Sequence, residues 1–212
     1  MTGPYIPNSD VSPIWNPEFF GNTIMVNRNT WPFHTVEQRR YRLRFLNGCQ
    51  SRFLILDFSG IPGVDVWQIG NEGGFLASPV NLTGDHDNRV LMGPAERVDL
   101  IVDFTQVPIG DQVLGNLGPD EPFGGGAPGV DFEPADPAST GQVMRFHVVP
   151  ALSVDPTTPA ARYLTLPSLA RLTGGTTRRL ALLEKMSEFF EDTPVEARLG
   201  TINGNPNVDA AT

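Results

Sequence analysis

Residues 40–45 hold the feature that most restricts the fold of this chain, a strict alternation of arginine with large apolar side chains. A period of two is typical of a β-strand with one buried and one exposed face. Asn47-Gly48 interrupts the pattern, and an apolar run resumes over residues 53–58. An Asn-Gly pair between two such runs predicts a hairpin. The residues expected to face the core are Tyr41, Leu43 and Phe45.

Further strand patterns follow along the chain, separated by glycine, proline and asparagine. A polar turn at residues 27–29 lies between residues 23–26 and a run that begins at Thr35, which predicts a second hairpin. With 22 glycines and 20 prolines among 212 residues, the chain favours an all-β sandwich or barrel. Later strands are predicted over residues 64–69, 89–92, 98–104, 112–117, 143–149 and 178–183.

Composition and charge argue against several classes of partner. The net charge of −9 argues against nucleic acid and anionic membrane surfaces, because both require a basic protein surface. No apolar run approaches the ~20 residues that span a bilayer. The first residues lack the basic and apolar parts of a signal peptide, so we expect a soluble chain without one. The single cysteine, Cys49, allows no disulfide within the chain and leaves the redox compartment open.

Three separated motifs resemble one known family, both in sequence and in order. The first is PEFFGNTIMVN, followed by WPF and RRYRLRFLNG, and the others are WQIGNEGGFL and MGPAERVDLIVDF. They span roughly residues 17–149 and resemble the middle domain of three-domain multicopper oxidases, the laccase, spore-coat-laccase and bilirubin-oxidase group. The resemblance implies a cupredoxin-like Greek-key β-sandwich. It also implies a parent enzyme that oxidises phenolic, bilirubin-like or metal-ion donors one electron at a time and reduces dioxygen to water.

The resemblance and the composition divide the chain into four parts. Residues 1–20 are predicted to be a linker from a preceding domain, 21–150 the middle cupredoxin-like domain, 151–177 a connector, and 178–212 the start of a truncated third cupredoxin domain. Met186, Phe189 and Phe190 lie at helical spacing, which predicts one short helix over residues 184–192. The expected partners are the missing first and third domains. Apolar tail residues that would pack on them favour a homo-oligomer or disorder where they are exposed, and examples are Leu164, Leu166, Phe189 and Phe190.

The resemblance implies copper in the parent enzyme, but no cofactor, metal ligand or catalytic residue in this chain. A blue copper site needs a cysteine thiolate and two imidazoles. The three histidines, His34, His86 and His147, form no His-x-His pair, and Cys49 has no flanking histidine. In the family the copper ligands come from the first and third domains. We therefore expect no oxidase activity from this chain alone, with Cys49 as a small, at least partly buried side chain.

Two groups of residues remain as site candidates. By motif position, the resemblance places Phe20, Gly21 and the loop around Gly124, Gly125 and Gly126 in a wall of the parent's reducing-substrate pocket. A glycine-rich loop offers open space and backbone groups to bulky aromatic donors, and the alternative is a flexible surface loop. The second group is predicted to be a salt-bridged structural corner, because structural ion pairs far outnumber catalytic ones. Its residues are Glu96, Arg97 and Asp99.

Two other classes of function stay open. The parent can be a copper-free cupredoxin relative that acts as a structural or interaction protein. A His-Pro-x-His segment and a His-Cys-His segment beyond Thr212 would discriminate the oxidase from that relative. A stand-alone binding module predicts instead a stable monomer with an ordered tail. The compartment of the parent is undetermined, and a secreted or periplasmic location is one alternative.

Overall fold

The computed structural model describes residues 10, 18–154, 161–168 and 170–201. The chain divides into two compact units, one of residues 18–169 and one of residues 1–17 and 170–212. Regular structure is almost entirely β, with one four-residue α-helix and one short 3-10 helix in the described parts. The all-β prediction is therefore confirmed. Within those described parts, no helix has the length and apolar character needed to cross a membrane.

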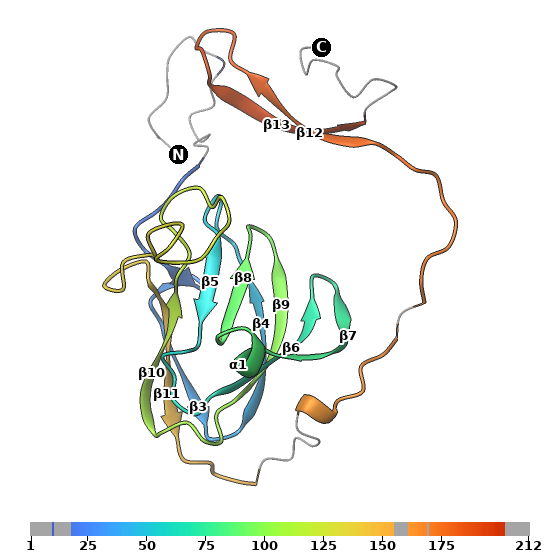
Figure 1. Ribbon diagram of the computed structural model, residues 1–212. Coiled ribbons are helices and arrows are strands. Elements are labelled where there is room, and N and C mark those ends of the chain that lie inside the picture. The colour runs from blue at the N-terminus through green and yellow to red at the C-terminus, as the bar shows by residue number, and fades with distance from the viewer. Residues whose placement is uncertain (1–9, 11–17, 155–160, 169, 202–212) are drawn as a thin grey trace. The chain divides into compact units, whose positions relative to one another are not determined.

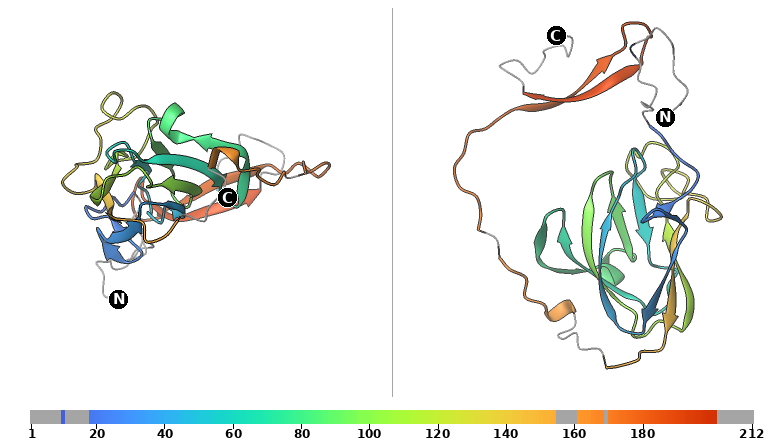
Figure 2. Two further views of the ribbon diagram at one scale, coloured as in Figure 1. Left: turned by 90° about the horizontal axis from the view of Figure 1, so that it is seen from below. Right: turned by 180° about the vertical axis from the view of Figure 1, so that it is seen from behind.

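The larger unit is a sandwich of two sheets, seen from two opposite sides in Figures 1 and 2. β11 pairs with β3 in parallel, and the other strand pairs of the two sheets are antiparallel. The five-stranded sheet, in the order β3-β11-β10-β5-β8, contains β3 (Phe33–Glu37), β5 (Leu54–Asp57), β8 (Arg89–Met92), β10 (Gly110–Asn116) and β11 (Gln142–Val149). The four-stranded sheet, in the order β4-β9-β6-β7, contains β4 (Arg40–Leu46), β6 (Asp65–Asn71), β7 (Gly74–Asn81) and β9 (Arg97–Asp103).

The predicted alternation sets the inner face of the four-stranded sheet. In β9, Val98, Leu100 and Val102 are buried while the residues between them are more accessible. In β4, alternate side chains pack against the core, whereas Arg42, Arg44 and Leu46 between and after them are exposed, as the period of two requires. The predicted strand register is therefore confirmed. The residues of β4 that pack against the core are Tyr41, Leu43 and Phe45.

The Asn47-Gly48 pair does not form a hairpin, and this prediction is wrong. The strand before it, β4, and the strand after it, β5, belong to different sheets. Asn47 is 1% exposed. Its Nδ2 donates to the carbonyl oxygens of Arg52 and Met92, and its Oδ1 accepts from the amide of Cys49. These bonds satisfy a buried amide and lead the chain across the core instead of back along β4.

The polar turn at residues 27–29 lies where it was predicted, but its partner strands differ. It joins β1 (Met25–Val26) to β2 (Asn29–Thr30), not to the run that begins at Thr35. Asn27 and Arg28 have positive φ angles of 50° and 71°, which suit a tight two-residue turn. The run at Thr35 belongs to β3 and pairs with β11 instead.

Two short helices complete the larger unit. α1 (Leu82–Asp85) begins at Asn81, whose side chain accepts from the amides of Thr83 and Gly84. The 3-10 helix η1 (Ala161–Tyr163) lies in the stretch predicted as a connector. It contacts β7 and buries Ala161, so these residues form part of the compact unit of residues 18–169.

The smaller unit contains an antiparallel hairpin of β12 (Leu180–Met186) and β13 (Pro194–Thr201). The short helix predicted over residues 184–192 is wrong, because β12 continues to Met186 and a turn follows. The Ser187 amide donates to the Thr193 carbonyl at 2.8 Å, and its Oγ accepts from the amides of Phe189 and Phe190. These local bonds favour a turn over a helix that would be too short to nucleate.

Candidate functional site

Arg52 joins the two segments that the family resemblance places in a pocket wall. It is 3% exposed. Its guanidinium donates to the carbonyl oxygen of Gly21 and lies 5.6 Å from the centroid of the Phe20 ring. It also donates to the carbonyl oxygen of Pro119 at 3.3 Å and pairs with the carboxylate of Asp120. A single buried cation therefore brings Phe20 and Gly21 to the start of the long loop between β10 and β11.

The long loop, residues 117–141, is closed at its neck. The hydroxyl of Thr140 donates to Asp120 Oδ2 at 2.6 Å. Asn116 is buried, and its Nδ2 donates to the carbonyl oxygen of Thr140 at 3.1 Å while its Oδ1 accepts from the Gly118 amide at 2.9 Å. A compact loop whose ends meet in this way presents the residues between them from a fixed base.

The glycines of the long loop form a tight turn. Gly125 and Gly126 have φ angles of 93° and 97°, a region that favours glycine. A Cβ at Gly126 would lie 2.4 Å from the Cβ of Asp131, whereas a Cβ at Gly124 or Gly125 would meet open space. The Asp131 carboxylate accepts from the Ala127 amide at 2.7 Å and closes the turn. Gly124 and Gly125 therefore leave room for another group beside the loop.

Phe123 ties the glycine turn to the sandwich. Its ring centroid lies 5.1 Å from that of Phe53 and 5.5 Å from that of Phe132. Phe53 follows Arg52 directly in the chain. Arg52 thus holds the segment of Phe20 and Gly21, and the next residue, Phe53, holds the glycine turn through Phe123.

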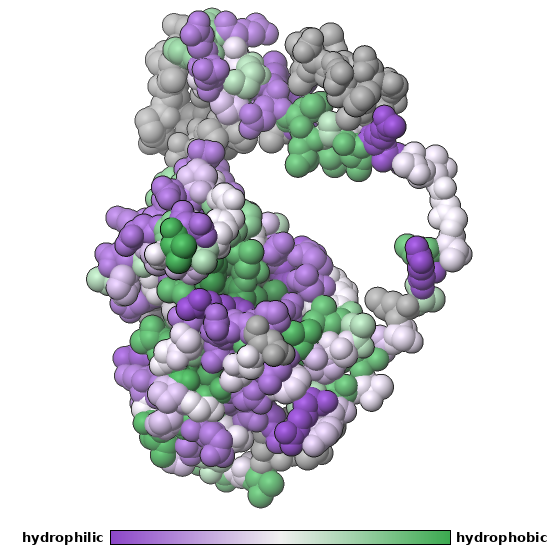
Figure 3. Space-filling model, viewed as in Figure 1, coloured by the Kyte–Doolittle hydropathy of each residue, from purple (hydrophilic) through white to green (hydrophobic). Residues whose placement is uncertain are grey.

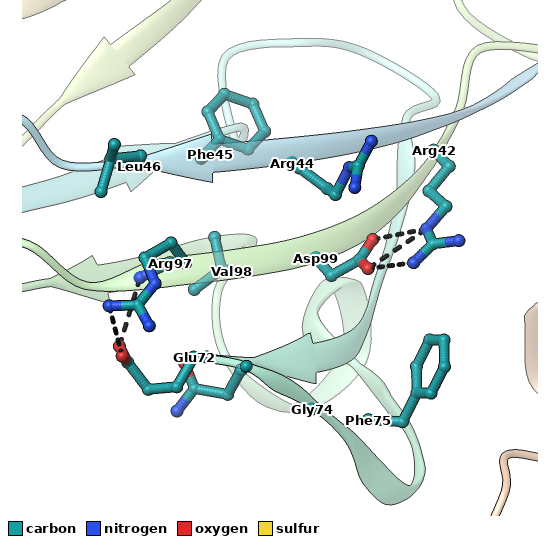
Figure 4. Close-up of a pocket in the computed structure, with 12 residues that line it drawn as sticks. Arg42, Arg44, Phe45, Leu46, Glu72, Gly74, Phe75, Arg97, Val98 and Asp99 are labelled. Carbon is teal, nitrogen blue, oxygen red and sulfur yellow. Dashed lines mark hydrogen bonds and ion pairs between the residues drawn. The ribbon is translucent and has the colours of Figure 1, made fainter.

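The three residues predicted as a salt-bridged corner do not pair with one another in the described structure. Arg97 pairs instead with Glu72 at 2.7 Å, and Asp99 accepts from Arg42 Nε at 2.9 and 3.1 Å (Figure 4). Glu96 accepts from a backbone amide of its own turn at 2.8 Å. The hydrogen bond to Asp99 raises the pKa of Arg42. A hollow of about 520 Å³ lies beside these ion pairs.

The candidate metal ligands lie on separate elements. His34 is in β3, His86 follows α1, and Cys49 lies in the crossing between the sheets. His147 Nδ1 lies 2.7 Å from Asp111 Oδ1, and this hydrogen bond holds the pKa of Asp111 below its ordinary value. Among the residues that the structure describes, no three His, Cys, Asp or Glu side chains gather into a possible metal site. As the described structure places them, Cys49 and the three histidines therefore do not fit a copper centre.

Reasoning from the sequence missed the polar residues that organise the candidate wall. Arg52 and Asp120 are 68 positions apart, and Asn116 and Thr140 are 24 apart, so no local pattern joins them. The one local signal was an arginine directly before the apolar run of residues 53–58. Such an arginine has to leave the core or find a partner.

Comparisons with known proteins give a consistent result. The chain is 32% identical to "Multicopper oxidase LPR2" of Arabidopsis thaliana over 94% of its own length and 31% of that protein. It is 40% identical to a laccase of Bacillus subtilis over 48% of this chain and 18% of the laccase. The crystal structure of a variant of the McoA multicopper oxidase of Aquifex aeolicus has a TM-score of 0.55 and 26% identity. The match covers 82% of this chain and 36% of that one.

No protein-family model matches the chain. The chain spans about a third of the length of the Arabidopsis relative. The likeness to the McoA structure supports the cupredoxin-like fold of the sandwich.

Proposed function

The chain belongs to the multicopper oxidase family, and on this premise we propose that residues 21–150 are the middle cupredoxin-like domain of a longer oxidase. Residues 1–20 lead in from a preceding domain, residues 151–177 lead onward, and residues 178–212 begin a third. Two observations support this division. The larger unit has a complete two-layer core, whereas the β12–β13 hairpin belongs to a separate unit.

The longer protein oxidises phenolic, bilirubin-like or metal-ion donors and reduces dioxygen to water, using copper held by other domains. One observation carries this proposal. A chain that matches about a third of a multicopper oxidase keeps its one cysteine and its three histidines on separate elements. The role of this chain is then to position the neighbouring domains and to contribute to the donor pocket.

The wall of that pocket consists of Phe20, Gly21 and the glycine turn at residues 124–126. Phe20 offers a ring held under the Arg52 guanidinium, and the turn offers open space with exposed backbone groups. An aromatic donor can stack on the ring while its hydroxyl meets the backbone of the turn. Because Arg52 binds both segments, the wall needs little rearrangement to receive a donor.

The first test measures copper and oxygen consumption. The longer gene product that contains this chain should bind copper and consume dioxygen when given 2,6-dimethoxyphenol. Residues 1–212 alone, incubated with excess copper and then desalted, should retain substoichiometric copper and consume no dioxygen. A longer product that folds but neither binds copper nor consumes dioxygen would instead support the copper-free structural relative.

The second test separates the wall from the scaffold. Phe20→Ala in the longer protein should raise the KM for a phenolic donor about fivefold, equivalent to about 1 kcal/mol, with unchanged copper content. Phe75→Ala is a matched control, because Phe75 also lies under an arginine, with Arg42 Cζ 5.4 Å from its ring centroid. Equal effects of the two variants on KM would contradict the wall assignment.

A further inference from the structure

A groove of about 900 Å³ opens on one side of the sandwich, and we call it the edge groove. Its walls are β4, β3, the β1–β2 hairpin and part of residues 19–23. Its floor consists of core side chains of the five-stranded sheet, namely Leu54, Leu56, Met92 and Phe146. The core of the larger unit is therefore reached from this side.

The rim of the edge groove is apolar and exposed. Phe19, Met25, Phe33 and Leu46 line it, and each is between 55% and 64% exposed. The face of the sandwich in Figure 3 shows hydrophobic patches among a mostly hydrophilic surface. A group of large apolar side chains around a buried apolar floor marks a surface that another molecule covers.

The charges of the edge groove are of one sign. No Asp or Glu is among its lining residues, although the chain carries a net charge of −9. Arg52 is neutralised by Asp120. Arg42, which lies in the same strand as Arg44, is neutralised by Asp99. Arg44 is exposed and has no ion pair or hydrogen bond with the described residues. The groove therefore offers an uncompensated guanidinium beside apolar surface.

Two sheet edges border the edge groove. Within the described structure β4 pairs only with β9, and β3 pairs only with β11, so each is the outer strand of its sheet. Residues 43–46 of β4 and residues 33–34 of β3 line the groove. An outer strand presents backbone donors and acceptors that an extended peptide can satisfy. A small apolar ligand would leave these backbone groups unused.

We propose that the edge groove docks an extended polypeptide segment, with apolar side chains and a carboxylate that pairs with Arg44, supplied by another part of the longer oxidase. This rests on the proposed function, because the chain accounts for only 31% of the Arabidopsis relative and the remaining sequence must pack somewhere. The segment adds a strand beside β4, covers the apolar rim and neutralises the Arg44 guanidinium.

The single cysteine of the chain serves as the reporter. Cys49 lines the edge groove, so a docked segment slows its alkylation. N-ethylmaleimide is applied to residues 1–212 and to the longer protein, and the Cys49 peptide is followed by mass spectrometry. We expect alkylation at least about tenfold slower in the longer protein, as for a site that is open less than a tenth of the time. Amide exchange of β4 should slow in parallel.

Two variants with matched controls test the contacts in the longer protein. Arg44→Glu and Leu46→Ser should restore most of the Cys49 alkylation rate of residues 1–212 alone. Arg171→Glu and Leu91→Ser should not, because both side chains are exposed and neither lines the groove. Arg44 is exposed, so its variant is expected to fold. If it does not, Leu46→Ser decides the result.

Three outcomes would overturn the docking proposal. Equal alkylation in the longer protein and in residues 1–212 would show an uncovered groove. Protection that depends on the concentration of residues 1–212 alone would show a second copy as the occupant. Protection in the longer protein that disappears after partial unfolding, dialysis and refolding would show a small ligand. The alkylation test is independent of the copper and oxygen measurements. If Cys49 is protected in a longer protein that neither binds copper nor consumes dioxygen, the proposed function is wrong and the docking proposal stands.

Discussion

The sandwich of residues 18–169 and the β12–β13 hairpin use the same apolar residue types in strands but bury them very differently. Leu100 in β9 is fully buried, whereas Leu182 in β12 is 87% exposed and Leu199 in β13 is 71% exposed. Both regions have long antiparallel ladders. The sandwich has a second sheet over its apolar face, and no second sheet covers the hairpin among the described residues of its unit. A ladder can form locally, but a core requires a second layer.

The largest expected effect is on the free energy of unfolding, when a buried leucine of the sandwich and an exposed leucine of the hairpin are each replaced by alanine. Leu100→Ala should lower the free energy of unfolding by about 2–5 kcal/mol, because it leaves a cavity between the two sheets. Leu182→Ala, the same change in the hairpin, should stay within about 0.5 kcal/mol. Chemical denaturation of both variants, followed by tryptophan fluorescence, measures the two values. A large decrease in stability for Leu182→Ala would mean that the hairpin has a covering layer.

The second prediction concerns the buried side-chain amide of Asn47, where the chain crosses from one sheet to the other. Asn47→Ala should lower the free energy of unfolding by about 1–3 kcal/mol, since it leaves the carbonyl oxygens of Arg52 and Met92 without their donor. Asn29→Ala is the matched control, because the side chain of Asn29 is exposed and donates a hydrogen bond to the nearby carbonyl oxygen of Asn27. Denaturation curves of equal midpoint for both variants would contradict a structural role for Asn47.

The alternation of apolar residues predicted strands and their faces well. The faces of β4 and β9 follow directly from a period of two, because that period is a property of the strand itself. The partner of a strand is a different matter. Asn47-Gly48 has the composition of a hairpin turn. Two buried hydrogen bonds from Asn47 to the carbonyl oxygens of Arg52 and Met92, and one that it accepts from the Cys49 amide, instead lead the chain to β5 in the other sheet.

The candidate site was less predictable than the fold, and for the same reason. Phe20 and Gly124 were assigned by family resemblance, but the residue that joins their segments, Arg52, acts through Asp120, which is 68 positions away. The helix predicted over residues 184–192 fails in the opposite way. The prediction rested on three apolar residues at helical spacing and gave no weight to Ser187. In the structure the hydrogen bonds of Ser187 turn the chain instead.

The third prediction compares the hairpin with the long loop of the sandwich, residues 117–141. The loop has an aromatic anchor, so Phe123→Ala should lower the stability by about 0.5–1.5 kcal/mol for each ring pair that it removes, those with Phe53 and Phe132. Limited proteolysis should then cut the loop faster. Phe189→Ala in the turn of the hairpin is the control, because Phe189 is exposed and should leave the cleavage rate there unchanged. Unchanged cleavage of the loop in Phe123→Ala would mean that its neck alone holds it.

The smallest effect is a pH dependence that also contrasts the two regions. Burial raises the pKa of the Cys49 thiol, and the nearby Arg52 charge opposes this only in part. The sandwich therefore disfavours the thiolate. The corresponding stability is fully present below the pKa of the unfolded thiol and is lost as the pH rises through the higher pKa of the folded one.

Alkylation of Cys49 at a series of pH values measures this difference, since the thiolate is the reactive form. The midpoint should lie at a higher pH in the folded chain than in urea. A Cys49→Ser, Leu182→Cys variant moves the thiol to an 87% exposed position in the hairpin, where water reaches it freely. Its folded and unfolded midpoints should coincide. A raised midpoint at position 182 would show that the hairpin is covered after all, and the contrast with the sandwich would no longer hold.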